Sequence, residues 1–216
     1  GAIEKGLTTI SLKNRFIREI KKYWSHVTFD LVVMPTPPIT FAGVMDYIKS
    51  RDKAKAYLIL RDIFPQNAKD IGLMKNGMIF SFFRSKEKYM YRIADHIGCM
   101  SQGNIDYVLR HNPEVAPSKL ELLPNWANAD ETEDMRQDID YKDKYGFKNK
   151  FVCVFGGNIG WPQELEFLIE LAKEYRSRED LLFLIIGKGV LAEKIRKIID
   201  ASDLTKVVMK DFLPRE

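Results

Sequence analysis

The sequence predicts an α/β protein with two parallel sheets, and three observations lead to that fold class. Short apolar runs alternate with longer amphipathic segments, which is the pattern of strands joined by helices. Turns rich in proline or glycine follow most of the apolar runs. The alternation stops over residues 127–150, which are acidic and then polar, and it restarts afterwards. We therefore expect two α/β domains, with helices on both faces of each sheet.

The first half of the chain contains four apolar runs that we interpret as strands. Their lengths and turn residues are typical of buried strands; they are residues 30–34, 56–60, 96–100 and 120–123. The segments around them repeat apolar residues every three or four positions, as amphipathic helices do. The expected helices are residues 12–24, 41–49, 77–94 and 102–110. The helices 12–24 and 77–94 are rich in bases and aromatic residues.

The second half opens on a strand, a glycine turn and a helix. Residues 151–155 are apolar, residues 156–160 read Gly-Gly-Asn-Ile-Gly, and Pro162 lies in the first turn of the helix expected over 162–176. Such a turn exposes main-chain N–H groups and suits an anion such as a phosphate. The spacing is not G-x-G-x-x-G and no Walker lysine follows, so a plain tight turn is the alternative. The remaining elements are strand 181–186, helix 190–200 and strand 207–209.

Charge divides unevenly between the halves. Residues 1–128 hold 19 lysines and arginines against 12 acids, whereas residues 129–216 hold 15 against 18. The first half is therefore expected to meet an anionic partner. No apolar run is long enough for a transmembrane helix. Cys99 and Cys153 lie in apolar runs and are expected to be buried thiols in a reducing cytoplasm, and no cysteine or histidine spacing indicates a metal site.

Seven segments, in order along the chain, resemble family 4 glycosyltransferases of the GT-B fold. The resemblance is to bacterial enzymes of capsule, O-antigen and exopolysaccharide assembly. The segments are DLVVMPTPP (30–38), LRDIFPQNAKDIG (60–72), YRIADHIGCMS (91–101), LLPNW (122–126), residues 151–169, FLIIGKG (183–189) and residues 207–216. The resemblance implies two Rossmann-like domains. The acceptor-side domain would span residues 1–128, an acidic linker or hinge residues 129–150, and the donor-sugar domain residues 151–216.

Both domains are expected to be incomplete. The first opens on a helix, without the leading strand and glycine loop of the family. The second stops before the family's paired-glutamate motif. We therefore expect a fragment of a longer protein that does not turn over by itself.

The resemblance implies transfer of a sugar from a nucleoside-diphosphate sugar, with a UDP-sugar expected, to a polyprenyl-pyrophosphate-linked or glycan acceptor. It implies a reaction that retains the configuration of the sugar and needs no metal or other cofactor. We expect no nucleic-acid partner. The expected location is the cytoplasm, peripheral on the inner face of the cell membrane, where the basic aromatic helices would meet an anionic surface. A non-catalytic module that binds a nucleotide or a partner is the main alternative, and a nucleotide-sugar epimerase is a weaker one.

The resemblance assigns donor-side roles to three groups of residues. Main-chain groups of Gly157, Asn158 and Gly160 would approach the pyrophosphate, with a structural turn as the alternative. Lys188, between Gly187 and Gly189, would neutralise the leaving diphosphate, or it is a solvated loop lysine. Phe212 and Leu213 would flank the nucleobase, or they close the core.

On the acceptor side, Arg61 and Asp62 are the candidate catalytic residues. They follow a predicted strand and would hold the acceptor hydroxyl or the sugar. The alternative is a buried Arg–Asp pair that fixes the turn. Asn125, at the end of its own strand, is a further candidate on this side.

Overall fold

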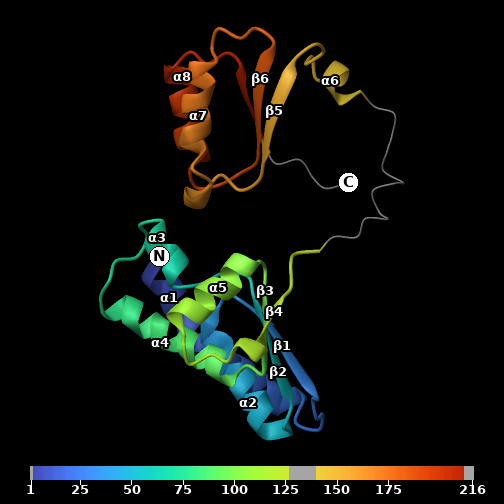
Figure 1. Ribbon diagram of the computed structural model, residues 1–216, viewed down its shortest axis with the longest axis vertical. Helices are drawn as coiled ribbons and strands as arrows, with labels where there is room; N and C mark the ends of the chain where they lie inside the picture. The colour runs from blue at the N-terminus through green and yellow to red at the C-terminus, as the bar shows by residue number, and fades with distance from the viewer. Residues whose placement is uncertain (1, 127–139, 212–216) are drawn as a thin grey trace. The chain divides into compact units, whose positions relative to one another are not determined.

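The structure, a computed structural model, describes residues 2–126 and 140–211, with side chains from residue 11 onward. It divides into two compact units, Gly1–Ala127 and Asn128–Glu216. Each unit contains a parallel sheet with helices packed against it (Figure 1). The α/β fold class predicted from the sequence is confirmed.

The first unit contains a four-stranded parallel sheet in the order β1-β2-β3-β4. Its strands are β1 (Leu31–Pro35), β2 (Lys55–Leu60), β3 (His96–Cys99) and β4 (Leu120–Leu122). Each coincides with a predicted run to within a residue at either end. Alternate residues of β2 (Ala56, Leu58 and Leu60) are buried against the helices, because successive side chains of a strand point to opposite faces.

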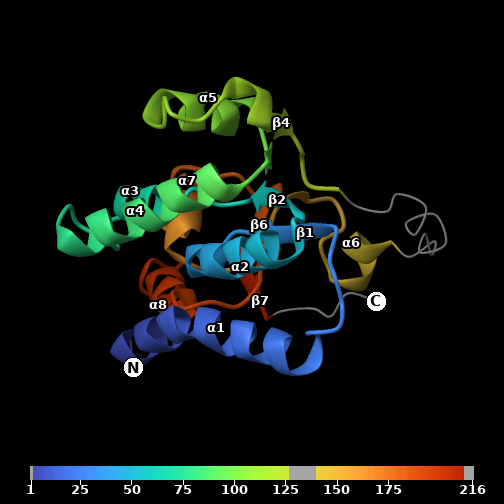
Figure 2. The same ribbon diagram turned by 90° about the horizontal axis from the view of Figure 1, so that it is seen from below.

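Five α-helices are found in the described part of this unit. They are α1 (Ala2–Tyr23), α2 (Ala42–Asp52), α3 (Gln66–Asp70), α4 (Met78–Ile93) and α5 (Gln102–His111). Helix α1 begins well before the predicted residue 12, and α3 was not predicted. Helix α1 packs beside α2 (Figure 2). The Ser101 hydroxyl caps α5 by accepting a hydrogen bond from the N–H of Asn104 at 3.2 Å.

The helices that connect these strands, α2, α4 and α5, lie on one side of the sheet (Figure 1). Right-handed crossovers between strands that follow one another in chain order place every connection on the same face. The opposite face carries Leu31 and Val33, which are 54% and 51% exposed. The prediction of helices on both faces is therefore wrong for the described connecting helices.

The second unit has a three-stranded parallel sheet in the order β5-β6-β7. Its elements are α6 (Tyr141–Lys144), β5 (Phe151–Gly156), α7 (Leu165–Glu174), β6 (Leu181–Ile186), α8 (Ala192–Ala201) and β7 (Val207–Lys210). Helices α7 and α8 cover one face, and the central strand β6 is apolar throughout, as buried parallel strands are. Cys99 is buried, Cys153 is partly buried and both are free thiols.

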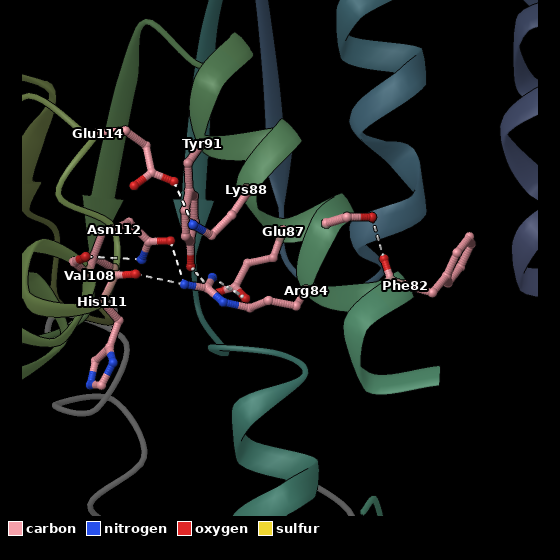
Figure 3. A network of polar contacts seen from close by, with 10 residues as sticks. Phe82, Arg84, Glu87, Lys88, Tyr91, Val108, His111, Asn112 and Glu114 are labelled. Atoms are coloured by element: carbon pink, nitrogen blue, oxygen red, sulfur yellow. Dashed lines mark hydrogen bonds and ion pairs between the residues drawn. The ribbon is translucent and has the colours of Figure 1, made fainter. Parts of the chain in front are cut away.

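A buried polar network joins α4 to the end of α5 (Figure 3). The Nη1 atom of Arg84 lies 2.7 Å from Oε2 of Glu87, which is 1% exposed. Glu87 also accepts a hydrogen bond from the Tyr91 hydroxyl at 2.8 Å, and Arg84 donates to Oδ1 of Asn112 at 2.7 Å. Burial raises the pKa of Glu87, although Arg84 and Tyr91 oppose that shift. The network fixes the distance between two helices that cover the sheet.

Candidate functional site

One buried apolar residue, Ile159, holds the glycine turn of the second unit in place. Strand β5 leads into Gly157, Asn158, Ile159 and Gly160, and a short 3-10 helix, η4 (Trp161–Gln163), follows. The Ile159 side chain is fully buried in the core of the unit. Gly157 and Asn158 are exposed. Burial of Ile159 thus holds the turn and leaves the two preceding residues at the surface.

The loop after β6 lies along this turn and is joined to it by backbone hydrogen bonds. The N–H of Gly157 donates to the carbonyl of Ile186 at 2.9 Å, and the N–H of Ile159 donates to the carbonyl of Lys188 at 2.8 Å. The carbonyl of Ile159 accepts from the N–H of Leu191 at 3.1 Å. The two loops are therefore one structural feature at the carboxyl ends of β5 and β6, where ligands of open α/β sheets bind.

Two of the glycines are required by this close approach. A Cβ on Gly187 would overlap the carbonyl oxygen of Gly157, and a Cβ on Gly189 would overlap the carbonyl of Ile159. At Gly157 itself a Cβ would make ordinary contact with the Phe155 ring at 3.6 Å. Loop packing therefore accounts for Gly187 and Gly189, whereas Gly157 leaves its main chain open to a ligand.

The helix after the turn begins later than predicted. Pro162 lies in η4, and α7 starts after Glu164, whose φ of 44° is left-handed and separates the two helices. The N–H groups of Asn158 and Gly160 have no hydrogen-bond acceptor within the part of the chain that the structure describes. Asn158 is exposed and Gly160 is buried, so the N–H of Asn158 is the more open of the two to an anion.

Lys188 stands directly beside the glycine turn, because its carbonyl is bonded to Ile159. Its side chain is exposed. No described residue forms an ion pair or hydrogen bond with its ammonium group. Phe212 and Leu213, the predicted neighbours of a nucleobase, lie outside the described residues.

In the first unit, Arg61 and Asp62 follow the carboxyl end of β2. Both side chains are exposed, and no ion pair joins them or links either to another described residue. The alternative of a buried Arg–Asp pair is therefore wrong. The turn is fixed instead by Thr36, 2% exposed, whose hydroxyl accepts from the N–H of Arg61 at 3.0 Å and of Asp62 at 3.2 Å.

Thr36 is the residue that sequence reasoning missed at this site. The signal was a hydroxyl residue inside the proline-rich turn after β1, because serine and threonine often bond to nearby main chain in turns. Asn125 is exposed in the segment after β4, two strands away from β2 in the sheet. The carboxyl ends of parallel strands share one edge, so Asn125 lies on the same edge as Arg61 and Asp62.

Neither a metal-ligand cluster nor a membrane-spanning helix is found within residues 2–126 and 140–211. Their histidine, cysteine, aspartate and glutamate side chains form no group of three or more that could hold a metal ion. No helix among them has the length and apolar character needed to cross a bilayer.

Two relatives match the chain by sequence, although no protein-family model does. The probable glycosyltransferase WbjE of Pseudomonas aeruginosa is 25% identical over 170 residues, which cover 78% of this chain and 42% of the relative. The putative colanic acid biosynthesis glycosyl transferase WcaI of Escherichia coli (strain K12) is 25% identical over 181 residues. The match covers 78% of this chain and 42% of the relative. The chain thus spans less than half the length of either relative.

A solved structure shares the fold. The crystal structure of Anabaena Alr3699/HepE in complex with UDP-glucose aligns with a TM-score of 0.63 and 12% identity, covering 94% of this chain and 52% of that one. At this level of identity the likeness concerns the fold. This chain is therefore similar in sequence to two glycosyltransferases and similar in fold to a protein solved with UDP-glucose.

Proposed function

We propose that this chain is part of a glycosyltransferase that transfers a sugar from a UDP-sugar to an acceptor in surface-polysaccharide synthesis. The observation that carries the proposal is the joined pair of loops after β5 and β6. There, the N–H groups of Asn158 and Gly160 have no acceptor among the described residues, and the turn that carries them is bonded to the carbonyl of the cationic Lys188. The glycosyltransferase relatives and the UDP-glucose held by Alr3699/HepE support a nucleotide sugar as the ligand.

In this proposal each group of the two loops has a separate task. The N–H groups of Asn158 and Gly160 donate to phosphate oxygens, and Gly157 lets the diphosphate approach the main chain. Lys188 neutralises the charge that develops on the leaving diphosphate. Gly187 and Gly189 keep the loops together. Phe212 and Leu213 would flank the nucleobase.

The proposed reaction retains the configuration at the transferred carbon. The bond from sugar C1 to the diphosphate oxygen breaks, and the acceptor hydroxyl oxygen bonds to C1 on the same face. The hydroxyl proton passes to an oxygen of the departing diphosphate. Backbone amides and Lys188 would supply the charge stabilisation that a metal ion supplies in other enzymes. Arg61 and Asp62 would hold the acceptor hydroxyl or the sugar, with Asn125 on the same sheet edge.

The acceptor that we propose is polyprenyl-pyrophosphate-linked or a glycan. Residues 1–128 would bind it, residues 151–216 would bind the donor, and residues 129–150 would link the two. The positive charge of the first half supports an anionic acceptor and contact with the inner face of the cell membrane.

Calorimetric titration of UDP into the 216-residue chain tests the donor site. Binding should weaken about tenfold in Lys188→Gln, since a charge-assisted contact is worth about 1.5–3 kcal/mol. It should also weaken in Gly157→Ala, which adds a methyl group to the exposed turn. Lys197→Gln on α8 is the charge-matched control. Absence of UDP binding, or equal affinities in all four proteins, would contradict the proposal.

A second experiment reads the encoding gene beyond codon 216 and assays its whole product with UDP-glucose and candidate acceptors. The family resemblance requires the paired-glutamate motif there. A continuation without it, together with intact UDP binding, would favour the alternative of a non-catalytic nucleotide-binding module.

A further inference from the structure

A pocket in the first unit lies between its two basic, aromatic helices. The pocket has a volume of about 440 Å³ and is bounded by α1, α4 and the start of α2 with the short 3-10 helix η1 (Ile39–Phe41) before it. Helix α1 contributes Lys13, and α4 contributes Phe82, Lys86 and Tyr89. The volume falls in the range of small-molecule sites.

The charge of this pocket is positive. Lys13 and Lys86 line it from opposite helices, and no carboxylate does so among the described residues. Neither lysine has a described ion-pair partner, although the Lys86 ammonium lies 5.3 Å from the centre of the Phe82 ring. The carboxylate of Asp46 accepts a hydrogen bond from the Tyr89 hydroxyl at 2.5 Å. The described lining of the pocket therefore carries two cations, and the nearby carboxylate of Asp46 is bonded to Tyr89.

The side chain of Lys13 packs against the start of α2. A Cβ on Gly43 would overlap Cδ of Lys13. The aliphatic stem of the lysine therefore lies directly on the helix, as long basic side chains commonly do, with the ammonium group beyond it. The missing side chain at residue 43 thus makes room for this cation between α1 and α2.

We propose that this pocket binds a phosphate or diphosphate group. Lys13 and Lys86 bind the phosphate oxygens, and Phe82 and Ile39 contact the apolar part of the ligand. Paired lysines suit this ligand because charge-assisted hydrogen bonds to phosphate are about twice as strong as neutral ones. The pocket shares no residue with the loops of the second unit, and binding there does not require sugar transfer. The phosphate belongs either to a soluble diphosphate compound or to a lipid headgroup, which present the same chemistry.

The test compares two double variants of equal charge. Lys13→Gln/Lys86→Gln removes the two cations of the pocket, whereas Arg15→Gln/Lys75→Gln removes two exposed cations that do not line it. Binding of inorganic pyrophosphate is measured by calorimetry at low salt. Flotation is measured with phosphatidylcholine vesicles that contain or lack phosphatidylglycerol. Thermal melting and UDP titration show that each variant is folded and that its second unit is unchanged.

The pocket variant should lose binding by about tenfold or more per lysine removed, and the control should stay close to wild type. Selective loss with pyrophosphate assigns a soluble ligand, and selective loss with anionic vesicles alone assigns a lipid. Gly43→Ala, which displaces Lys13, should weaken the same interaction. Equal loss in both double variants indicates general electrostatic attraction and overturns the proposal, as does absence of binding to both probes.

Discussion

The hydroxyl of Thr36 accepts a hydrogen bond from the main-chain N–H of Asp62, 26 residues along the chain. The same oxygen accepts from the N–H of Arg61 and lies 3.3 Å from the carbonyl of Asp62, to which it can donate. Thr36 thus ties the turn after β1 to the turn after β2. Its side chain is 2% exposed, so the hydroxyl makes these bonds away from bulk water.

Thr36→Val should destabilise the first unit by about 1–3 kcal/mol at nearly constant side-chain volume. It removes the acceptor of the Asp62 N–H and leaves the Arg61 N–H with the carbonyl of Ile59, at 3.1 Å, as its remaining acceptor. Thr36→Ser keeps the hydroxyl and should recover most of that loss, apart from the missing methyl group. Urea denaturation followed by circular dichroism measures the difference. Equal stabilities of the valine and serine variants would show that the hydroxyl does not fix this turn.

Gly189→Ala should separate the two loops of the second unit. The added Cβ overlaps the carbonyl of Ile159, so the backbone must move, and we expect a loss of about 1–3 kcal/mol, the usual cost of forcing extra volume into a packed site. Gly157→Ala is the matched control, since its Cβ makes ordinary contact with Phe155. Thermal melting of both variants gives the comparison, and similar melting temperatures would contradict the assigned loop packing.

The buried pair of Arg84 and Glu87 should behave as a coupled unit. Arg84→Met and Glu87→Gln each leave one partner buried without its counter-charge, a change that costs about 3–5 kcal/mol in buried pairs. The double variant removes both charges and should cost less than the sum of the single changes. A double-mutant cycle in urea measures the coupling. Additive losses would mean that the two side chains act independently, despite their 2.7 Å separation.

The strands were predictable because each signal is local. The run LLFLII of β6 is apolar at every position, and β2 alternates in burial as an α/β strand with one covered face should. The helix start near Pro162 was misplaced because proline favours the first turn of either helix type. The left-handed Glu164 that separates η4 from α7 has no sequence signal, since glycine is the residue typical of that conformation.

The missed parts of the candidate site depend on contacts between distant segments. The sequence singled out the turn at Gly157 and the loop at Gly189 one at a time. Only the backbone bonds between them explain why glycine stands at 187 and 189. The same holds for Thr36, whose partners come from another strand end. The placement of α2, α4 and α5 on one face of the first sheet follows from strand order, which local patterns do not contain.

Asp95 should give the first unit an acid-sensitive contribution to stability. Its carboxylate lies 2.7 Å from the Lys49 ammonium and accepts from the N–H of Ala56 at 2.8 Å, so it joins α2 to β2. Burial alone would raise the pKa of Asp95, but these two bonds outweigh burial and hold the pKa below its ordinary value of 3.8. A carboxylate with a lowered folded-state pKa stabilises the fold above its unfolded-state pKa, and the contribution disappears as the pH falls through the folded-state value.

Asp95→Asn should therefore cost about 1–2 kcal/mol at neutral pH, since hydrogen bonds to a charged group are lost. The deficit should shrink as the pH is lowered through and below 3.8, because wild-type Asp95 becomes protonated as well. Asp106→Asn, an exposed change on α5, is the control for general effects of charge. Urea denaturation at a series of pH values measures both variants. If the charge of Asp95 stabilises the fold, the unfolding free energies of wild type and Asp95→Asn should become equal at low pH. A difference that stays constant at the lowest pH measured would contradict this and would assign the effect of Asp95 to side-chain geometry.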